Sequence, residues 1–333
     1  MADTLRLAII GAGTIVEIMH LPAAAKTNNI SLAALFDPNL HRAQLLAARY
    51  AIPVVDSDYK NHLDKFDAAI VATPNNTHAA ISIDLLRAGK HVLVEKPAAF
   101  SVSQLEDMMK AEKDGKAKIG VGQVKRFYPY HKFIKQALAD GVFGNLRSID
   151  IQYSTIFNYP MASDSFLRKE TAGGGCFFDM GVHYLDLLNW WVGPMEIVRY
   201  EDDAVDGIEA SARIELIGNA NKIPITISLD RLRELPSYIH LRFEQSSLEI
   251  KSVYGGGIEI QTNAGNVKGD LPNVSNRPYL QNGIDQLEAF VKFIKGEQPA
   301  GTSLQEAWEV LTIIERAYAQ KQPITYEWEQ VGL

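Results

Sequence analysis

The chain has 333 residues, a length typical of about two domains and ample for a large buried core, so a disulfide-held miniprotein is excluded. Hydrophobic residues make up 47% and charged residues 22%, far from the low hydrophobicity and high charge of disordered chains. The formal charge of -7 argues against nucleic acid and anionic lipid as partners, so small molecules or proteins are expected instead.

Cysteine content and the N-terminus bear on the cellular compartment. Cys176 is the single cysteine, so neither an intrachain disulfide nor a structural zinc cluster can form. The N-terminus lacks the long apolar core and cleavage site of a signal peptide, and no run reaches the ~18 apolar residues of a membrane span. We therefore expect a cytoplasmic protein that does not cross a membrane.

The first 122 residues alternate short apolar runs with segments of helical spacing. The runs have the length of buried strands and cover 5–10, 32–36, 68–72, 91–94 and 117–121. Helix signals lie between them: Ser101 with Gln104 three residues later resembles a capping box, and Gly89 and Gly115 stand where helices should end. This pattern predicts an α/β fold with a doubly wound parallel sheet, a Rossmann domain over residues 1–122.

Beyond residue 122 the apolar pattern changes to the alternation typical of antiparallel strands. Apolar and polar residues alternate around 149–155, 223–229, 241–243 and 258–260, and helices are expected at 129–140, 175–191, 281–295 and 303–320. The pattern predicts an α+β domain over residues 123–333 with a large, mostly antiparallel open sheet. One face of this sheet is expected to stay uncovered and to carry enough aliphatic and aromatic surface to drive formation of a homodimer or homotetramer.

A Gly-x-Gly pair, Gly11 and Gly13, follows the first expected strand and opens a helix with Thr14 and Ile15. Glycine there permits a tight turn and a close approach to a pyrophosphate. Val16 replaces the usual third glycine, which predicts wider packing of the helix against the strand. Residues 1–122 hold 13 basic and 13 acidic residues, so backbone amides and a helix N-terminus would have to bind the phosphates. Taken alone, the pair is also compatible with an ordinary glycine-rich turn.

Asp37 lies 24 residues after Gly13, at the end of the second expected strand. A carboxylate there accepts hydrogen bonds from the adenosine ribose hydroxyls and repels a 2′-phosphate. The alternative is simple turn chemistry in the segment Asp37-Pro38-Asn39. We favour ribose binding, and therefore NAD over NADP as the cofactor.

Two polar segments follow the strands expected at 68–72 and 91–94. Because the carboxyl ends of parallel strands form the ligand crevice in this architecture, both segments should face the cofactor. Lys96 comes directly after a buried strand and is fixed between Glu95 and Pro97, an unusual place for a solvated lysine. The cofactor-binding candidates in the two segments are Thr73, Pro74, Asn75, His78, Glu95 and Lys96.

Asp179 and His183 lie four residues apart in the most apolar expected helix, so they share one face of it. A carboxylate that fixes the tautomer of an imidazole and raises its basicity is what a general base requires. Two alternatives remain: His183 could be a satisfied core residue, or the pair could be metal ligands. No further ligand stands at a supporting spacing, so no metal is expected.

These motifs together resemble the glucose-fructose oxidoreductase, inositol dehydrogenase and rhizopine-catabolism family, known as Gfo/Idh/MocA. The resemblance covers almost the full length and is carried by Gly-x-Gly, Asp37, Ala-Thr-Pro-Asn with His78, residues 88–97, Arg126, Gly144 and Gly-Gly-Gly with Asp179 and His183. It implies catalytic roles for Lys96, Asp179 and His183 around the nicotinamide and the reacting carbinol. It also implies a cofactor contact for Gln123 and substrate contacts for Lys96, Arg126, Arg168, His183 and Tyr279.

We therefore expect an NAD-dependent oxidoreductase that interconverts a secondary alcohol and a ketone on a sugar, a polyol or a nucleotide-linked sugar. One alternative is a cofactor-sensing or sugar-sensing regulatory protein on the same scaffold. Another is an enzyme that cleaves a glycoside and uses NAD only transiently.

Overall fold

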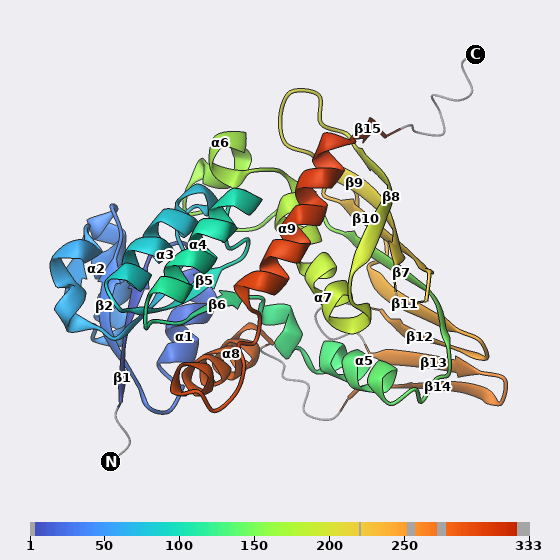
Figure 1. The fold of residues 1–333 in the computed structure, drawn as a ribbon, viewed down its shortest axis with the longest axis horizontal. Helices are drawn as coiled ribbons and strands as arrows, with labels where there is room; N and C mark the ends of the chain where they lie inside the picture. The colour runs from blue at the N-terminus through green and yellow to red at the C-terminus, as the bar shows by residue number, and fades with distance from the viewer. Residues whose placement is uncertain (1–3, 220, 252–256, 272–277, 325–333) are drawn as a thin grey trace.

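The computed structural model describes residues 4–219, 221–251, 257–271 and 278–324. Two sheets stand at opposite ends of the molecule, with helices between them and around the first sheet (Figure 1). The first sheet is built from the N-terminal part of the chain and the second from the C-terminal part. This is the predicted fold class.

The first sheet has six parallel strands in the order β3-β2-β1-β4-β5-β6, which is the doubly wound order of dinucleotide-binding domains. The strands are Leu5–Ile10 (β1), Ile30–Phe36 (β2), Val54–Asp56 (β3), Ala68–Val71 (β4), His91–Glu95 (β5) and Ile119–Gly122 (β6). β3 was not predicted, because three half-buried residues carry too short an apolar run to be recognised.

The helices of the first part begin with a π-helical turn over Val16–His20 that leads into Leu21–Ala24 (α1). Val16 is fully buried in the core beneath this turn. The Ser101 side chain accepts a hydrogen bond from the Gln104 N–H, so the predicted N-cap is present. The remaining helices are Leu40–Tyr50 (α2), His78–Arg87 (α3) and Val102–Asp114 (α4).

The second sheet has nine strands in the order β14-β13-β12-β11-β7-β10-β9-β8-β15. Its neighbours pair antiparallel except for β7 with β10 and β8 with β15, which are parallel. The strands are Leu146–Ser154 (β7), Met195–Asp202 (β8), Ser211–Gly218 (β9), Ile223–Asp230 (β10), Tyr238–Phe243 (β11), Ser246–Ile250 (β12), Ile258–Thr262 (β13), Gly265–Gly269 (β14) and Gln322–Pro323 (β15).

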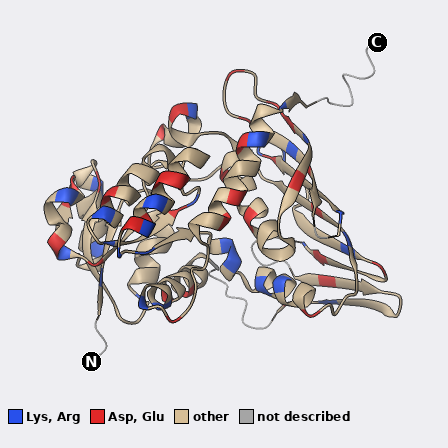
Figure 2. Ribbon diagram, in the orientation of Figure 1, with Lys and Arg blue, Asp and Glu red and all other residues tan. Residues whose placement is uncertain are grey.

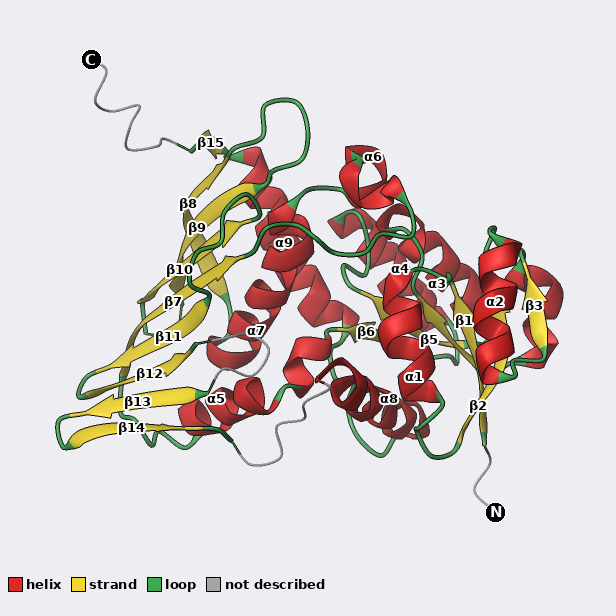
Figure 3. Cartoon of the chain, turned by 180° about the vertical axis from the view of Figure 1, so that it is seen from behind, coloured by secondary structure: helices red, strands yellow, loops and turns green. Residues whose placement is uncertain are grey.

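Helices cover one face of the second sheet and leave the other uncovered (Figure 3). On the covered side, alternate residues of β7 and β10, such as Ile151 and Ile227, are fully buried in one core with helix α7. The helices between the two sheets are Pro129–Ala139 (α5), Lys169–Ala172 (α6), Val182–Val192 (α7) and Leu304–Ala319 (α9). A π-helical turn over Phe177–Gly181 precedes α7.

The uncovered face of the second sheet differs from the expectation of an aliphatic and aromatic surface. Its outward positions are mostly polar or charged, and Asp150, Arg213, Thr226 and His240 lie on neighbouring strands. Acidic and basic residues both mark these strands in Figure 2. The outward face thus offers less aliphatic and aromatic surface than the prediction assumed, because the polar residues that alternate with the buried positions form it.

Helix α8, Pro278–Lys295, is late in the chain but packs on the first domain. Leu287 and Phe290 are buried in the same apolar cluster as strand β1. A Cβ on Gly283 would lie 3.0 Å from the Met19 side chain, so the helix approaches the turn before α1 closely. Residues 1–122 therefore do not complete the core of the Rossmann domain by themselves.

Candidate active site

The carboxyl ends of β1, β4 and β5 meet at one edge of the first sheet, where the Gly-x-Gly loop lies. Gly11 has a φ of +106°, and a Cβ there would lie 2.3 Å from the Ala72 carbonyl oxygen, so only glycine fits. A Cβ on Gly13 would meet no atom within 4 Å, which leaves the loop open on that side. This glycine cradle at the start of a helix fits a dinucleotide pyrophosphate.

Asp37 comes directly after β2 and reaches this loop. Its Oδ2 accepts a hydrogen bond of 2.6 Å from the Ala12 N–H, and its Oδ1 accepts one of 2.7 Å from the Asn39 N–H. The Arg42 side chain donates to the Ala12 carbonyl and pairs with Glu17 at 2.9 Å. The predicted cofactor carboxylate is thus held beside the phosphate loop, a placement that suits a ribose contact.

The segment after β4 is tied to the segment after β5 by a buried histidine. The His78 imidazole lies between the carbonyl oxygens of Thr73 and Pro97, 2.8 Å from each. Burial lowers the pKa of His78, against the opposing effect of the two carbonyls. His78 therefore positions both loops from beneath. Asn75 instead donates to the Ala172 carbonyl at 2.8 Å and links its loop to the second domain.

Glu95 ends β5 and forms a buried pair with His20. The distance from His20 Nε2 to Glu95 Oε1 is 2.8 Å, while Glu95 Oε2 accepts a hydrogen bond from the Lys96 N–H. Burial opposes ionisation of Glu95, but the hydrogen bond and charge of His20 lower its pKa overall. No motif in the sequence singles out His20.

Lys96 reaches across to the second domain and meets Asp179. Its Nζ lies 2.6 Å from Asp179 Oδ1 and 3.1 Å from the Asp179 carbonyl oxygen. The other carboxylate oxygen of Asp179 accepts a hydrogen bond from Arg231. Although burial raises the pKa of Asp179, the two adjacent cations lower it to about 2. Asp179 is therefore an ionised bridge between Lys96 and Arg231.

His183 has a different partner from the predicted one. Its Nδ1 lies 2.9 Å from Gln123 Oε1, and no hydrogen bond joins it to Asp179. The prediction was wrong because it assumed α-helical spacing, whereas the π-helical turn over Phe177–Gly181 rotates Asp179 relative to His183, and two cations occupy its oxygens. Burial lowers the pKa of His183, and nearby Lys96, Lys125 and His131 lower it further.

Lys125 is a buried lysine that sequence reasoning missed. Its Nζ makes no hydrogen bond to a described residue and lies 4.2 Å from the centre of the Tyr184 ring and 5.5 Å from that of Tyr153. Burial lowers its pKa to about 7, helped by the charge of Lys96 and opposed by that of Asp179. Lys125 is therefore the third basic side chain, after Lys96 and Arg231, whose charge is felt by Asp179.

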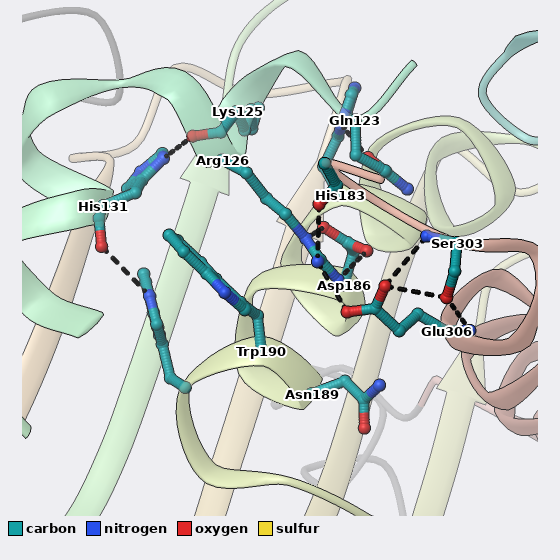
Figure 4. Close-up of polar contacts among 12 residues, drawn as sticks. Gln123, Lys125, Arg126, His131, His183, Asp186, Asn189, Trp190, Ser303 and Glu306 are labelled. Carbon is teal, nitrogen blue, oxygen red and sulfur yellow. Dashed lines mark hydrogen bonds and ion pairs between the residues drawn. The ribbon is translucent and has the colours of Figure 1, made fainter. Parts of the chain in front are cut away.

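Arg126 lies in a second ion cluster, with Asp186 and Glu306 (Figure 4). Its guanidinium forms two hydrogen bonds of 2.8 Å with Asp186 and one of 2.7 Å with Glu306, and it also donates to the Gly301 carbonyl. The Arg126 side chain is only 4% exposed. These contacts favour a structural role for Arg126 over the predicted substrate contact.

The remaining predicted residues lie at the rim of the site or beside it. Arg168 is well exposed and pairs with Asp164. Tyr279, at the start of α8, and Ile15 of the cofactor loop both pack against a small apolar cluster of Met19, Val124 and Tyr128. Thr14 donates a 2.7 Å hydrogen bond to the carbonyl of Pro160, in the loop that follows β7. Residues from both domains thus enclose the Gly-x-Gly loop.

Arg231 and Lys125 carried weak signals in the sequence. Each lies near the end of a strand or short helix among other charged residues, where a solvated side chain is the ordinary expectation. Their burial depends on contacts between segments far apart in the chain.

Within the described residues, no three His, Cys, Asp or Glu side chains are placed to hold a metal ion. The helices among these residues are all too short or too polar to span a membrane.

Comparisons with known proteins agree with this architecture. Residues 5–123 match the oxidoreductase family with an NAD-binding Rossmann fold, and residues 131–214 match the Gfo/Idh/MocA C-terminal domain. Together the two matches cover more than half of the chain.

Two curated relatives and one solved structure illustrate the similarity. Inositol 2-dehydrogenase of Rhizobium meliloti is 24% identical over 97% of this chain and 99% of its own length. Oxidoreductase P35 of Formosa agariphila is 27% identical over 60% of this chain, and the match spans 64% of that protein's length.

The structure is that of a 3-ketoreductase from Actinomadura kijaniata in complex with NADP and TDP-benzene. It is 19% identical, covers 97% of this chain and 100% of its own, and has a TM-score of 0.85, which shows a shared fold. By its two domain matches and its fold, the chain belongs to the Gfo/Idh/MocA family of oxidoreductases and carries that family's NAD-binding Rossmann domain.

Proposed function

We propose that the protein is an NAD-dependent oxidoreductase that interconverts a secondary alcohol and a ketone on a sugar, a polyol or a nucleotide-linked sugar. The observation that carries this proposal is that Lys96, at the end of β5, bonds Asp179 on the helical segment that also bears His183, close enough for its charge to lower the pKa of His183. The bound nicotinamide would supply the hydride acceptor or donor. The named relatives, an inositol dehydrogenase and a 3-ketoreductase, support a polyhydroxylated substrate.

His183 is suited to accept the proton of the substrate hydroxyl. Because Gln123 Oε1 accepts a hydrogen bond from its Nδ1–H, the proton of the neutral imidazole is on Nδ1 and the lone pair is on Nε2. No described residue hydrogen-bonds Nε2. Burial and the nearby cations keep the ring neutral at physiological pH, the form that a general base needs.

Lys96 is suited to hold the substrate oxygen. Its ammonium is fixed by Asp179 from one side, which leaves a third N–H to donate to an alcohol or carbonyl oxygen. Such a donor stabilises negative charge as the hydroxyl loses its proton. Asp179 is the positioning residue for Lys96, a role different from the His183 contact that its sequence position predicted.

Cofactor choice in this proposal follows Asp37. Its carboxylate gains hydrogen bonds from the ribose hydroxyls of NAD and repels the 2′-phosphate of NADP. We also propose that the protein forms a homo-oligomer through the uncovered face of the second sheet, which polar and charged contacts would hold. A light-scattering mass equal to the 36.9 kDa monomer at micromolar concentration would contradict this.

The test incubates the full chain with NAD and a panel of inositols, free sugars and nucleotide sugars, and follows NADH absorbance and products by mass spectrometry. A ketone formed in equal amount to NADH supports the proposal. Cleaved products without NADH identify an enzyme that uses NAD transiently. Ligand binding with no turnover on any member, unchanged in His183→Ala, identifies a sensor and overturns the proposal.

A further inference from the structure

Arg231 follows β10 directly and is held in place by aromatic packing and backbone contacts. Its guanidinium carbon lies 4.9 Å from the centre of the Phe157 ring. The backbone N–H of Arg231 donates a hydrogen bond of 2.9 Å to the Ala210 carbonyl. Its side chain is 13% exposed. The Phe157 ring therefore holds the guanidinium by a cation–π contact that uses none of its N–H donors.

Most hydrogen-bond donors of Arg231 have no partner in the described part of the protein. A guanidinium carries five N–H groups, and the contact to Asp179 is the one side-chain hydrogen bond of Arg231 among these residues. Arg126 makes four such contacts in its own cluster. The unpaired donors of Arg231 keep some access to solvent, so they are free to donate to a ligand that brings acceptor oxygens.

The charges around Arg231 also favour an anion. Asp179 offers a single negative charge to two cations, Lys96 and Arg231, and Lys125 adds a partly protonated amine. Glu95 is the other acid close to Lys96, and it is bonded to His20. Burial lowers the pKa of His183, and the charges of Lys96 and Lys125 lower it further. Arg231 also lies near Glu209, Asp203 and Asp230, which act with it on Cys176. The positive charge is therefore confined to Lys96 and Arg231, where they share one carboxylate, and an anionic group would be stabilised there.

The anionic group of the substrate would lie close to the reacting carbon. Lys96 and Arg231 are bonded to the two oxygens of the same carboxylate, so they lie within one small molecule's reach. A substrate whose hydroxyl oxygen contacts Lys96 can therefore contact Arg231 with a substituent on a nearby ring carbon.

We propose that the substrate is an anionic sugar or polyol, with a carboxylate or phosphate close to the oxidised carbon, and that Arg231 binds this anionic group. The planar fork of arginine matches two oxygens of a carboxylate or phosphate at once. This inference rests on the proposed oxidoreductase function and narrows its substrate class.

The first experiment compares matched compounds with the NAD-loaded full chain. Glucose is set against glucuronate and glucose 1-phosphate, and galactose against galacturonate, with kcat/KM measured by NADH formation and binding by calorimetry. One anionic member is expected to exceed its neutral match by at least about 10-fold, equal to one charge-assisted hydrogen bond. The uronates and the sugar phosphate distinguish the two sources of the anion.

The second experiment changes Arg231 itself. Arg231→Gln is expected to raise the KM or Kd of the anionic compound about 10- to 100-fold while changing that of its neutral match little. Arg231→Lys keeps the charge without the fork and should recover part of the loss. Arg6→Gln removes the same charge from an exposed pair with Asp67, at the amino end of β1 and away from the site, and is the matched control.

The outcomes separate the two proposals. Turnover of neutral compounds with no anionic preference overturns this inference and leaves the oxidoreductase function intact. An equal loss for both compounds in Arg231→Gln shows a merely structural role and also overturns it. If nothing is turned over, the binding data decide, and the absence of preferential binding to any anionic member counts against it.

Discussion

Two ion clusters lie on one continuous helical segment, seven residues apart, and they differ in how completely their donors are used. Asp186 holds Arg126, whose other contacts go to Glu306 and a backbone carbonyl. Asp179 holds Lys96 and Arg231, and the donors of Arg231 other than the one bonded to Asp179 have no partner among the described side chains. The first cluster is closed, and the second is open.

This difference distinguishes a charged side chain that stabilises the fold from one that can bind a ligand. A buried ion pair in which nearly all donors are satisfied, as in the four hydrogen bonds of Arg126, ties segments together, and removing one partner leaves an uncompensated charge. An open cluster keeps donors for a ligand and is less effective at stabilising the fold. Burial and charge alone would not distinguish Arg126 from Arg231, whereas the count of satisfied donors does.

The largest expected effect is on turnover in the open cluster. Lys96→Ala should lower kcat by ~10²- to 10⁴-fold or more, because it removes a substrate hydrogen bond and stabilising charge together. NAD affinity, measured by fluorescence titration, should change little. Lys96→Arg should not restore turnover, because the planar guanidinium does not fit the place of a compact ammonium. Near-normal kcat in Lys96→Ala would mean that the open cluster is not catalytic.

Arg126→Met tests the closed cluster through stability. It leaves the Asp186 carboxylate buried without its partner, so the free energy of unfolding should fall by about 3 to 5 kcal/mol in urea titrations. Replacing Asp186 by Leu as well should recover part of the loss. Arg147→Met, in an exposed pair with Glu244, is the control and should cost less than about 1 kcal/mol. A raised KM at unchanged stability would instead make Arg126 a substrate residue.

Lys125 belongs to neither cluster and should destabilise the fold in a pH-dependent way. Its pKa is about 7 in the folded protein and 10.5 ordinarily, so between these pH values only the unfolded chain holds the proton on this amine. The resulting loss of folding stability is complete below about pH 7. As pH rises to about 10.5 the penalty disappears. Lys125→Met should therefore raise the free energy of unfolding by about 3 kcal/mol at pH 7, allowing for the lost contact with Tyr184.

Thermal unfolding from pH 6 to pH 10.5 checks this, with Lys132→Met as an exposed control. The stability curves of the wild type and Lys125→Met should converge at high pH. A constant difference across the whole range would show that Lys125 is not a buried cation.

The smallest expected effect concerns Asp37, which contacts the phosphate loop. Ribose hydrogen bonds and repulsion of the 2′-phosphate should give the wild type a preference for NAD of ~10- to 100-fold. Asp37→Ser should narrow this gap, measured as the ratio of Kd values for NADP and NAD. Tighter binding of NADP than NAD by the wild type would exclude the ribose role of Asp37.

Local patterns in the sequence were enough for the fold class and the cofactor loop. Buried parallel strands appear as continuous apolar runs, and Gly11 is required by its own backbone and by Ala72. The partner of His183 could not be predicted, since Gln123 is sixty residues away and a π-helical turn changes the spacing of Asp179. Arg231 and Lys125 are buried by tertiary contacts that leave no local pattern.

Helix α8 has a consequence for the order in which the chain is made. Leu287 and Phe290 complete an apolar core to which Leu7 and Ile9 of the first strand belong. A ribosome releases those first strands long before it synthesises α8. Until then the Rossmann sheet exposes an apolar flank to solvent, and the nascent N-terminal domain cannot bury that flank before α8 has been synthesised.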